Sequence, residues 1–232
     1  MRDGGVSMST ALIIGAGTGL SASLARQLQA RGHNLVLAAR DTGDLRDLAQ
    51  ETGATLVDCN ARDRADMDRL FYPIDATGSP LDIAIYNPSS RVRGPVDEVD
   101  PEAVENAILV SGYGAFLMAH HAVQRMRPRW QGALLFTGAS AGVKGFANSS
   151  SFAMGKFALR GLCQALAREL HPRGIHVGHF VIDGGIAKPG TDNENAAWLD
   201  PDAVAQSYMH FLDQHRSSWA WEIELWPWVE RF

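Results

Sequence analysis

Cysteine is scarce in this chain of 232 residues, which has only Cys59 and Cys163. A disulfide framework needs paired cysteines and an oxidising compartment. One of the two cysteines follows a predicted strand and the other lies in a predicted helix, a pattern typical of buried, reduced thiols. The sequence therefore predicts a cytoplasmic protein without a disulfide scaffold. It predicts no metal site either.

Basic charge is not in excess, since 21 Lys and Arg stand against 26 Asp and Glu and give a formal net charge of −5. Nucleic acids and anionic membranes attract proteins through basic surfaces, so neither is an expected partner. Long apolar runs are also missing, and no segment reaches the length of a membrane span. The short polar start has no signal-peptide core. We expect residues 1–10 to be a disordered leader and residues 11–232 to form one domain.

Short apolar runs rich in branched residues alternate with longer amphipathic stretches. This alternation is typical of repeated strand-helix-strand units around a parallel sheet covered on both faces. The sequence predicts an α/β, doubly wound fold of the Rossmann type. The expected strands span residues 11–14, 34–39, 54–58, 81–86, 133–137, 175–182 and 219–225. Two helices, over residues 101–126 and 151–171, are longer than the others. Residues 184–200, rich in Gly, Pro, Asn and Asp, are either a lid over a ligand or a plain surface loop.

A glycine-rich turn follows the first predicted strand. Its residues are Gly15, Ala16, Gly17, Thr18, Gly19, Leu20 and Ser21. Glycines in a turn between strand and helix permit the tight bend and let backbone N–H groups approach a pyrophosphate. We expect the turn from Gly15 through Gly17, Thr18 and Gly19 to Leu20 to bind a dinucleotide.

The end of the second predicted strand indicates which dinucleotide. A carboxylate at this position binds the free 2′-hydroxyl of NAD, whereas a small residue followed by arginine accommodates a 2′-phosphate. Here the strand ends in Ala39 and Arg40. NADP(H) is the preferred cofactor on this basis, and NAD(H) is the alternative.

Several motifs occur together in one order: the glycine-rich turn, Asp58 after the third strand, Asn87 after the fourth, and a long helix with Lys156. In this order and at these separations, the chain resembles the short-chain dehydrogenase/reductase superfamily. The resemblance implies further residues around the cofactor. These are Cys59 beside Asp58, Pro88 and Ser89 after Asn87, Lys156 at the nicotinamide ribose, and Asp183, Gly184 and Ile186 after the sixth strand.

The resemblance also implies catalytic positions, and this sequence departs from most of them. The family's lysine corresponds to Lys156, but its proton-donating tyrosine corresponds to Phe152, which has no hydroxyl. The relay asparagine corresponds to Ser111, and the substrate-orienting serine falls at Ala139, with Ser140 one residue displaced. Hydride transfer belongs to the nicotinamide, so proton delivery is the step that Phe152 cannot perform.

A substitute proton donor would have to lie nearby. The candidates are Lys156 acting through a water, Tyr113 on the preceding helix, and the hydroxyls of Ser149, Ser150 and Ser151, one of which is also expected to cap a helix. Two functions remain open. One is an oxidoreductase for a small carbonyl or alcohol substrate, and the other is a cofactor-binding sensor or partner protein without turnover. The resemblance further implies a homodimer or homotetramer.

Overall fold

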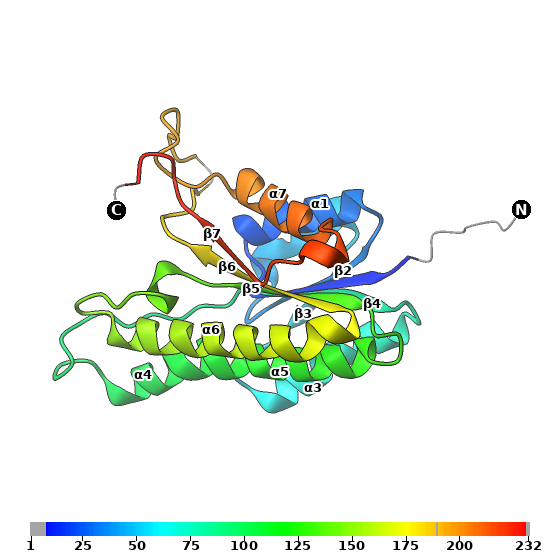
Figure 1. Cartoon of the computed structure of the whole chain (residues 1–232), viewed down its shortest axis with the longest axis horizontal. Coiled ribbons are helices and arrows are strands. Elements are labelled where there is room, and N and C mark those ends of the chain that lie inside the picture. The colour runs from blue at the N-terminus through cyan, green and yellow to red at the C-terminus, as the bar shows by residue number, and fades with distance from the viewer. Residues whose placement is uncertain (1–7, 189, 231–232) are drawn as a thin grey trace, which may run out of the picture.

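The computed structural model describes residues 8–188 and 190–230. Within them, seven parallel strands form one sheet with helices on both faces (Figure 1). The strands are β1 (Thr10–Ile14), β2 (Asn34–Ala39), β3 (Thr55–Asp58), β4 (Leu81–Tyr86), β5 (Gly132–Thr137), β6 (Ile175–Ile182) and β7 (Glu222–Leu225). The α-helices are α1 (Leu20–Ala30), α2 (Arg46–Thr52), α3 (Arg64–Ala76), α4 (Pro101–Ile108), α5 (Gly114–Met126), α6 (Ser150–Leu170) and α7 (Pro201–Leu212). The α/β doubly wound prediction is confirmed.

The strand order is β3-β2-β1-β4-β5-β6-β7, with every neighbouring pair parallel. The chain reverses its direction of winding between β1 and β4, so the loops that leave these two strands diverge to opposite faces. A crevice forms at such a switch point, beyond the carboxyl ends of the strands. The glycine-rich turn after β1 and Asn87 after β4 both lie at this edge.

Two apolar layers hold the sheet between its helices. In Figure 1, helices α3 to α6 cover one face, while α1 and α7 cover the other. Phe71, Met118 and Leu159 are fully buried in the first layer, and Leu24 and Phe211 are almost fully buried in the second. Burial on both faces explains why β1 and β6 show no alternation of apolar and exposed polar residues, since every residue of both strands is buried.

The predicted strands agree closely with the observed ones. The bounds of β2, β4 and β6 are as predicted, and β1, β3 and β5 differ by one residue at their starts. The last strand is shorter than predicted, because residues 219–221, which follow a 3₁₀ turn at Arg216–Ser218, are irregular and β7 begins only at Glu222. Thr10, placed in the predicted leader, is the first residue of β1. Residues 1–7 of that leader lie outside the described residues.

The helical segment predicted over residues 101–126 has the observed bounds, but a π-helical turn at Leu109–Tyr113, which was not predicted, divides it into α4 and α5. The buried hydroxyl of Tyr86 donates a hydrogen bond to the carbonyl of Val110. Val110 lies within the π-helical turn, so its carbonyl accepts a hydrogen bond from a side chain outside the helix. Gly114 makes the approach possible, because a Cβ there would lie 2.2 Å from Tyr86 Oη and 2.5 Å from the carbonyl oxygen of Ala61.

Replacing Gly114 by alanine should therefore destabilise the fold. We expect Gly114→Ala to lower the free energy of unfolding by about 1–3 kcal/mol, because backbone and a buried hydroxyl must move to admit the methyl group. Gly161→Ala is the matched control, since a Cβ at Gly161 in α6 meets nothing within 4 Å. The control should gain up to about 1 kcal/mol from helix propensity. Urea titrations of both variants measure the difference, and a Gly114→Ala protein as stable as wild type would contradict the packing argument.

Candidate active site

Two adjoining cavities lie beyond the carboxyl ends of the strands. The larger, of about 780 Å³, extends over the ends of β1 to β4, and the smaller, of about 540 Å³, over the ends of β4, β5 and β6. Asn87 and Ser89 line both. The two cavities thus form one cleft along the sheet edge, long enough for an extended ligand. The larger one is lined by Ile14, Gly15, Ala16, Ala39, Arg40, Asp41, Cys59, Asn60, Ala61, Arg62, Asn87, Pro88, Ser89, Ser90, Asn106 and Val110.

The glycine-rich turn brings bare backbone to this cleft. Gly15 has a φ of +77° and approaches Pro88 so closely that a Cβ would lie 2.6 Å from the Pro88 nitrogen. Gly17 and Gly19 have open space where a Cβ would stand. Helix α1 begins at Leu20, directly after Thr18 and Gly19, without a side-chain cap. Backbone N–H groups at an uncapped helix start, next to open space, suit the anionic pyrophosphate of a dinucleotide.

Ser21, which stands where the resemblance implies a third glycine, braces this turn. Its hydroxyl donates to the carbonyl of Gly15 at 3.1 Å and accepts a hydrogen bond from Asn87 Nδ2 at 2.7 Å. The side chain of Asn87 is therefore engaged in holding the turn after β1 against the end of β4. Pro88 and Ser89, which the resemblance assigns to the cofactor, line the cleft.

The far end of the larger cavity carries two arginines. Arg40 lines it as predicted, and Arg62, which the sequence reasoning missed, lines it from the loop after β3. Asp58 follows β3, and its Oδ1 accepts hydrogen bonds from the Thr42 hydroxyl at 2.8 Å and the Thr42 amide at 3.1 Å. Burial raises the pKa of the Cys59 thiol to about 12, so this lining residue stays a neutral, unreactive group.

Lys156 is the buried cation of the smaller cavity. Its side chain extends from α6 to the end of β5, where Nζ donates a hydrogen bond to the carbonyl of Thr137 at 2.8 Å, and the residue is only 2% exposed. Burial lowers the pKa of the Lys156 ammonium to about 8. A lysine with this pKa exchanges its proton near neutral pH, which an ordinary surface lysine does not.

Phe152 lies one helical turn before Lys156 and also lines the smaller cavity. The Lys156 ammonium lies 5.8 Å from the centre of the Phe152 ring, and the Arg91 guanidinium lies 4.9 Å from the same centre. Arg91 comes from the loop after β4 and lines the cavity too. Sequence reasoning missed it, because nothing local marks a loop arginine as part of a site. The smaller cavity therefore contains two cations around one aromatic ring.

The serines before Phe152 hold Arg91 in place. Ser149 accepts a hydrogen bond from Arg91 Nη2 at 3.0 Å. Ser151 donates to the carbonyl of Val92 at 2.8 Å and accepts from the Val92 amide at 3.1 Å. Both serines are almost fully buried. The predicted helix cap is wrong for Ser149, which makes no side-chain cap bond to α6; instead, these two hydroxyls fix the loop that carries Arg91.

The other predicted catalytic residues are in different surroundings. Ser140 lines the smaller cavity beside Ala139. Ser111 is fully buried under α6, where its hydroxyl accepts a long hydrogen bond of 3.5 Å from the Ser90 amide. Tyr113 stacks on Phe116 with a centroid separation of 6.2 Å and does not line the smaller cavity. The structure therefore brings Ser140 to the cavity with Lys156, and leaves Tyr113 apart.

The loop after β6 closes the far side of the smaller cavity. Gly184 and Ile186 line it, while the carboxylate of Asp183 pairs with Lys144 at 3.1 Å. Beyond Ile186 the chain forms a loop, and an isolated β-bridge pairs Ile186 with Leu199 at its end. The described residues of the predicted lid form neither a helix nor a longer strand.

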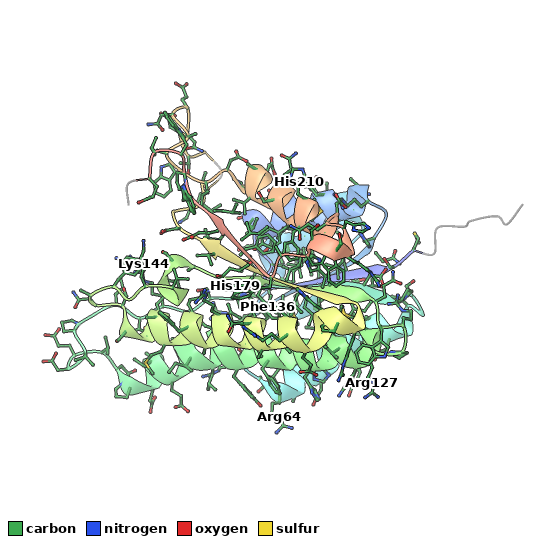
Figure 2. All side chains as sticks on the ribbon, in the orientation of Figure 1. Arg64, Arg127, Phe136, Lys144, His179 and His210 are labelled. Carbon is green, nitrogen blue, oxygen red and sulfur yellow. The ribbon has the colours of Figure 1, made fainter. Side chains whose placement is uncertain are left out.

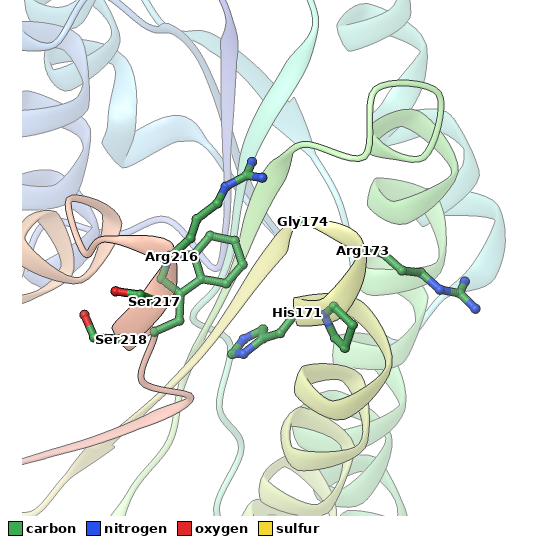
Figure 3. A pocket seen from close by; sticks show the side chains of 8 residues that line it. His171, Arg173, Gly174, Arg216, Ser217 and Ser218 are labelled. Atoms are coloured by element: carbon green, nitrogen blue, oxygen red, sulfur yellow. The ribbon is translucent and has the colours of Figure 1, made fainter.

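Another depression, of about 520 Å³, lies where α6 leads into the start of β6, away from the carboxyl ends of the strands (Figure 3). It is lined by residues 171–174 and 216–219. The guanidinium groups of Arg173 and Arg216 extend in different directions there. None of the predicted site residues lies in it.

The fold, the cleft and Lys156 agree with what the comparison with known proteins finds. The model of the short chain dehydrogenase family matches residues 9–198. The chain belongs to this family. Members of this family are oxidoreductases that use NAD or NADP.

Individual relatives share about a quarter of the sequence. The 3-oxoacyl-acyl-carrier-protein reductase MabA of Mycobacterium tuberculosis is 24% identical over 88% of this chain and 78% of its own. The trans-4-hydroxycyclohexanecarboxylate dehydrogenase of Sinomonas cyclohexanicum is 30% identical over 80% of this chain and 75% of its own. A short-chain dehydrogenase from Rhodopseudomonas palustris has a solved structure with a TM-score of 0.83 and 29% identity, covering 95% of this chain and 99% of its own.

The described residues include neither a candidate membrane-spanning helix nor a candidate metal-binding cluster. No helix there is long and apolar enough to cross a membrane. No group of three or more His, Cys, Asp or Glu side chains is arranged to hold a metal ion.

The buried ammonium of Lys156 should reduce stability at neutral pH. The folded pKa of about 8 lies below the ordinary value of 10.5, so the unfolded chain binds the proton more tightly and stability rises as pH increases from 8 to 10.5. We expect Lys156→Met to stabilise the protein by roughly 1–3 kcal/mol at pH 7, after allowing for the lost bond to Thr137. The advantage should shrink by pH 9.5. Denaturant titrations at both pH values measure it.

Lys144→Met is the control for this experiment, because Lys144 is half-exposed and lies on the loop after β5. It should change stability little at either pH. A Lys156→Met protein that is less stable than wild type at pH 7, and equally so at pH 9.5, would contradict a buried charge at this position.

Proposed function

We propose that this protein is an NADP(H)-dependent oxidoreductase that interconverts a small carbonyl compound and its alcohol, with Phe152 in the place of the family's tyrosine. One observation carries the proposal. Two cations, Lys156 and Arg91, approach Phe152 inside the cavity that adjoins the glycine-rich turn. They supply positive charge and an exchangeable proton where a tyrosine hydroxyl is absent.

The preference for NADP(H) rests on Arg40 and Arg62. Both line the larger cavity, and a 2′-phosphate with two negative charges favours a site with two guanidinium groups. Asp41 lines the same cavity, but its carboxylate accepts the Gly43 amide at 2.8 Å. NAD(H), with a free 2′-hydroxyl, gains nothing from the arginines.

The nicotinamide, when bound, supplies the hydride. The residues of this chain would bind the cofactor and orient it. The turn from Gly15 to Leu20 would hold the pyrophosphate, and Lys156 would donate a hydrogen bond to the nicotinamide ribose. Ser89, Gly184 and Ile186 line the smaller cavity, where the substrate carbonyl lies between Ser140 and the two cations.

Proton delivery then falls to Lys156. During reduction, the carbonyl carbon accepts the hydride and the oxygen becomes an alkoxide, which takes a proton from the Lys156 ammonium and leaves a neutral amine. A group with a pKa of about 8 is suited to this exchange near neutral pH. Arg91 stays charged and stabilises the developing oxyanion. Within the described residues no carboxylate perturbs Arg91, whose pKa is lowered by burial and by Arg93.

The second candidate is a protein that binds NADP(H) without turnover, as a sensor or partner. The positions of Ala139, Ser111 and Phe152 favour it, because none of these side chains offers a proton to a substrate in the smaller cavity. We further propose that the protein acts in the cytoplasm as a homodimer or homotetramer, with a small-molecule substrate and without nucleic-acid or membrane partners.

Removing the two arginines tests the cofactor. In Arg40→Ala and Arg62→Ala, the dissociation constant for NADPH should rise about tenfold each, the effect of losing a charge-assisted bond of about 1.4 kcal/mol. The constant for NADH should change less than about twofold. Fluorescence titration of the reduced nicotinamide measures both, and tighter binding of NADH than NADPH by the wild-type protein would contradict the proposal.

Variants of the cations test turnover. NADPH oxidation is measured with a panel of carbonyl compounds that includes 3-oxoacyl thioesters and oxocyclohexanecarboxylates, related to the compounds in the names of the relatives. Lys156→Ala should abolish wild-type activity, and Arg91→Leu should lower it about 10²-fold while NADPH still binds. Phe152→Tyr, which restores a hydroxyl beside Lys156, should keep or raise it. If wild type and Phe152→Tyr both bind NADPH and neither turns over any compound, the sensor function is supported instead.

A further inference from the structure

A buried histidine lies behind the smaller cavity in a network of charged side chains. His179, on β6, is fully buried, and its Nδ1 lies 2.9 Å from Glu222 Oε2 on β7. Arg160, one turn after Lys156 on α6, donates to both oxygens of the same carboxylate at 2.7 and 2.8 Å. Figure 2 shows His179 between the sheet and the helix layer below it. Three elements thus converge on one carboxylate.

The other nitrogen of this imidazole has no partner. Within the described part of the chain, His179 Nε2 is buried and makes no hydrogen bond. It faces the backbone of Gly138, where a Cβ would lie only 2.2 Å away. Gly138 follows Thr137, whose carbonyl accepts the hydrogen bond from Lys156 Nζ. An unsatisfied buried ring nitrogen therefore lies directly behind the residues that hold the Lys156 ammonium.

The groups around the ring decide its protonation. Burial lowers the pKa of His179, the bond to Glu222 opposes this, and the charges of Lys156 and Arg160 lower it further. Cys163, also on α6, is held neutral by burial, which raises its pKa. With Lys156 charged, His179 is neutral, its Nδ1–H donates to the Glu222 carboxylate, and Nε2 carries a lone pair.

We infer that His179 is the proton partner of Lys156, and that Glu222 stabilises the imidazolium formed when the proton leaves Lys156. This relay rests on the proposed function. In alcohol oxidation, the substrate hydroxyl gives its proton to the neutral Lys156 amine, and the hydride passes from the carbon to the oxidised nicotinamide of a bound NADP. Within the described residues His179 Nε2 makes no direct hydrogen bond, so the proton reaches it from Lys156 through one intervening water: an N–H bond at Lys156 breaks, one forms at Nε2, and reduction runs the same transfers backwards. His179 touches neither substrate nor cofactor, so it is a relay residue.

The network of His179 and Glu222 lies in a different part of the fold from the proton relay that the resemblance implies. That route passes through position 111, on the helix before α6, where Ser111 is fully buried against Gly155 and the loop at Ser90. The His179 network leads instead to β7, an edge strand of the sheet, where the Glu222 side chain is 20% exposed and reaches solvent. A proton on His179 thus has a carboxylate beside it that opens to water.

Nitrogen-15 NMR of the histidine rings tests the coupling without any substrate. In the wild-type protein, His179 should be the Nδ1–H tautomer at pH 7. In Lys156→Met its titration midpoint should rise by about one pH unit, because a nearby positive charge is gone. Lys144→Met is the matched control and should leave the midpoint unchanged. An unchanged midpoint in a folded Lys156→Met protein would overturn the inference.

The pH dependence of turnover tests the relay itself, with the best substrate of the carbonyl panel. His179→Gln keeps a hydrogen-bonding side chain but cannot hold a second proton. We expect kcat to fall about tenfold, its pH profile to lose one ionisation, and KM and the NADPH dissociation constant to stay within about twofold. His176→Gln, on the same strand but stacked on Trp219, is the control that should keep the wild-type profile.

The two experiments separate the failures. If the wild-type protein turns over no substrate, the proposed function fails, while the NMR titration still supports or overturns the proton coupling. If wild type is active and His179→Gln has the wild-type pH profile, the relay is overturned and the proposed function stands. Melting temperatures of both glutamine variants exclude misfolding as the cause of a lower rate.

Discussion

The hydrogen bond from the Lys156 ammonium to the carbonyl of Thr137 is the contact around which the site is built. A charged amine can be buried to 2% exposure only if backbone and neighbouring groups are arranged for it. Gly142 lets the loop after β5 approach α6, since a Cβ there would lie 3.0 Å from the Lys156 carbonyl oxygen. Gly155 does the same between α6 and Ser111, where a Cβ would lie 2.7 Å from the serine Cβ. The tuned pKa of this lysine is a result of that close packing.

Lys156 separates two different environments. On the cavity side, Phe152 and Arg91 surround the space where a carbonyl oxygen would gain charge, and buried serines fix Arg91 through its loop. On the sheet side, His179 and Glu222 offer an acceptor and a carboxylate. A tyrosine hydroxyl normally joins proton donor and substrate contact in one group. In the mechanism that we propose, the two tasks are divided between Arg91, which stays charged, and Lys156, which exchanges its proton.

Much of this arrangement could be predicted from the sequence, because it depends on local patterns. Apolar runs between polar turns gave β2, β4 and β6 their bounds, and the glycine spacing located the turn before α1. Arg40 and Lys156 follow from their positions relative to these elements. The π-helical turn at Leu109–Tyr113 could not be predicted, since it occurs where the hydroxyl of Tyr86, on β4, donates a hydrogen bond to the carbonyl of Val110. Arg91 and Arg62 were missed for the same reason, because only tertiary packing brings them to the cleft, and only tertiary packing places His179 behind it. Asp58 was assigned to the cofactor on resemblance, and its contact with Thr42 could not be predicted from the sequence.

The central claim is that Lys156 is a proton-exchanging group near neutral pH, and the chain permits a direct measurement. It has only three lysines, Lys144, Lys156 and Lys188, so protein labelled with carbon-13 at lysine Cε gives three signals that can be assigned by substitution. Their chemical shifts are followed from pH 6 to pH 11. A signal that disappears in Lys156→Met and titrates with a midpoint near 8 is the predicted result. A Lys156 signal that titrates at the ordinary lysine value of 10.5 would contradict the account.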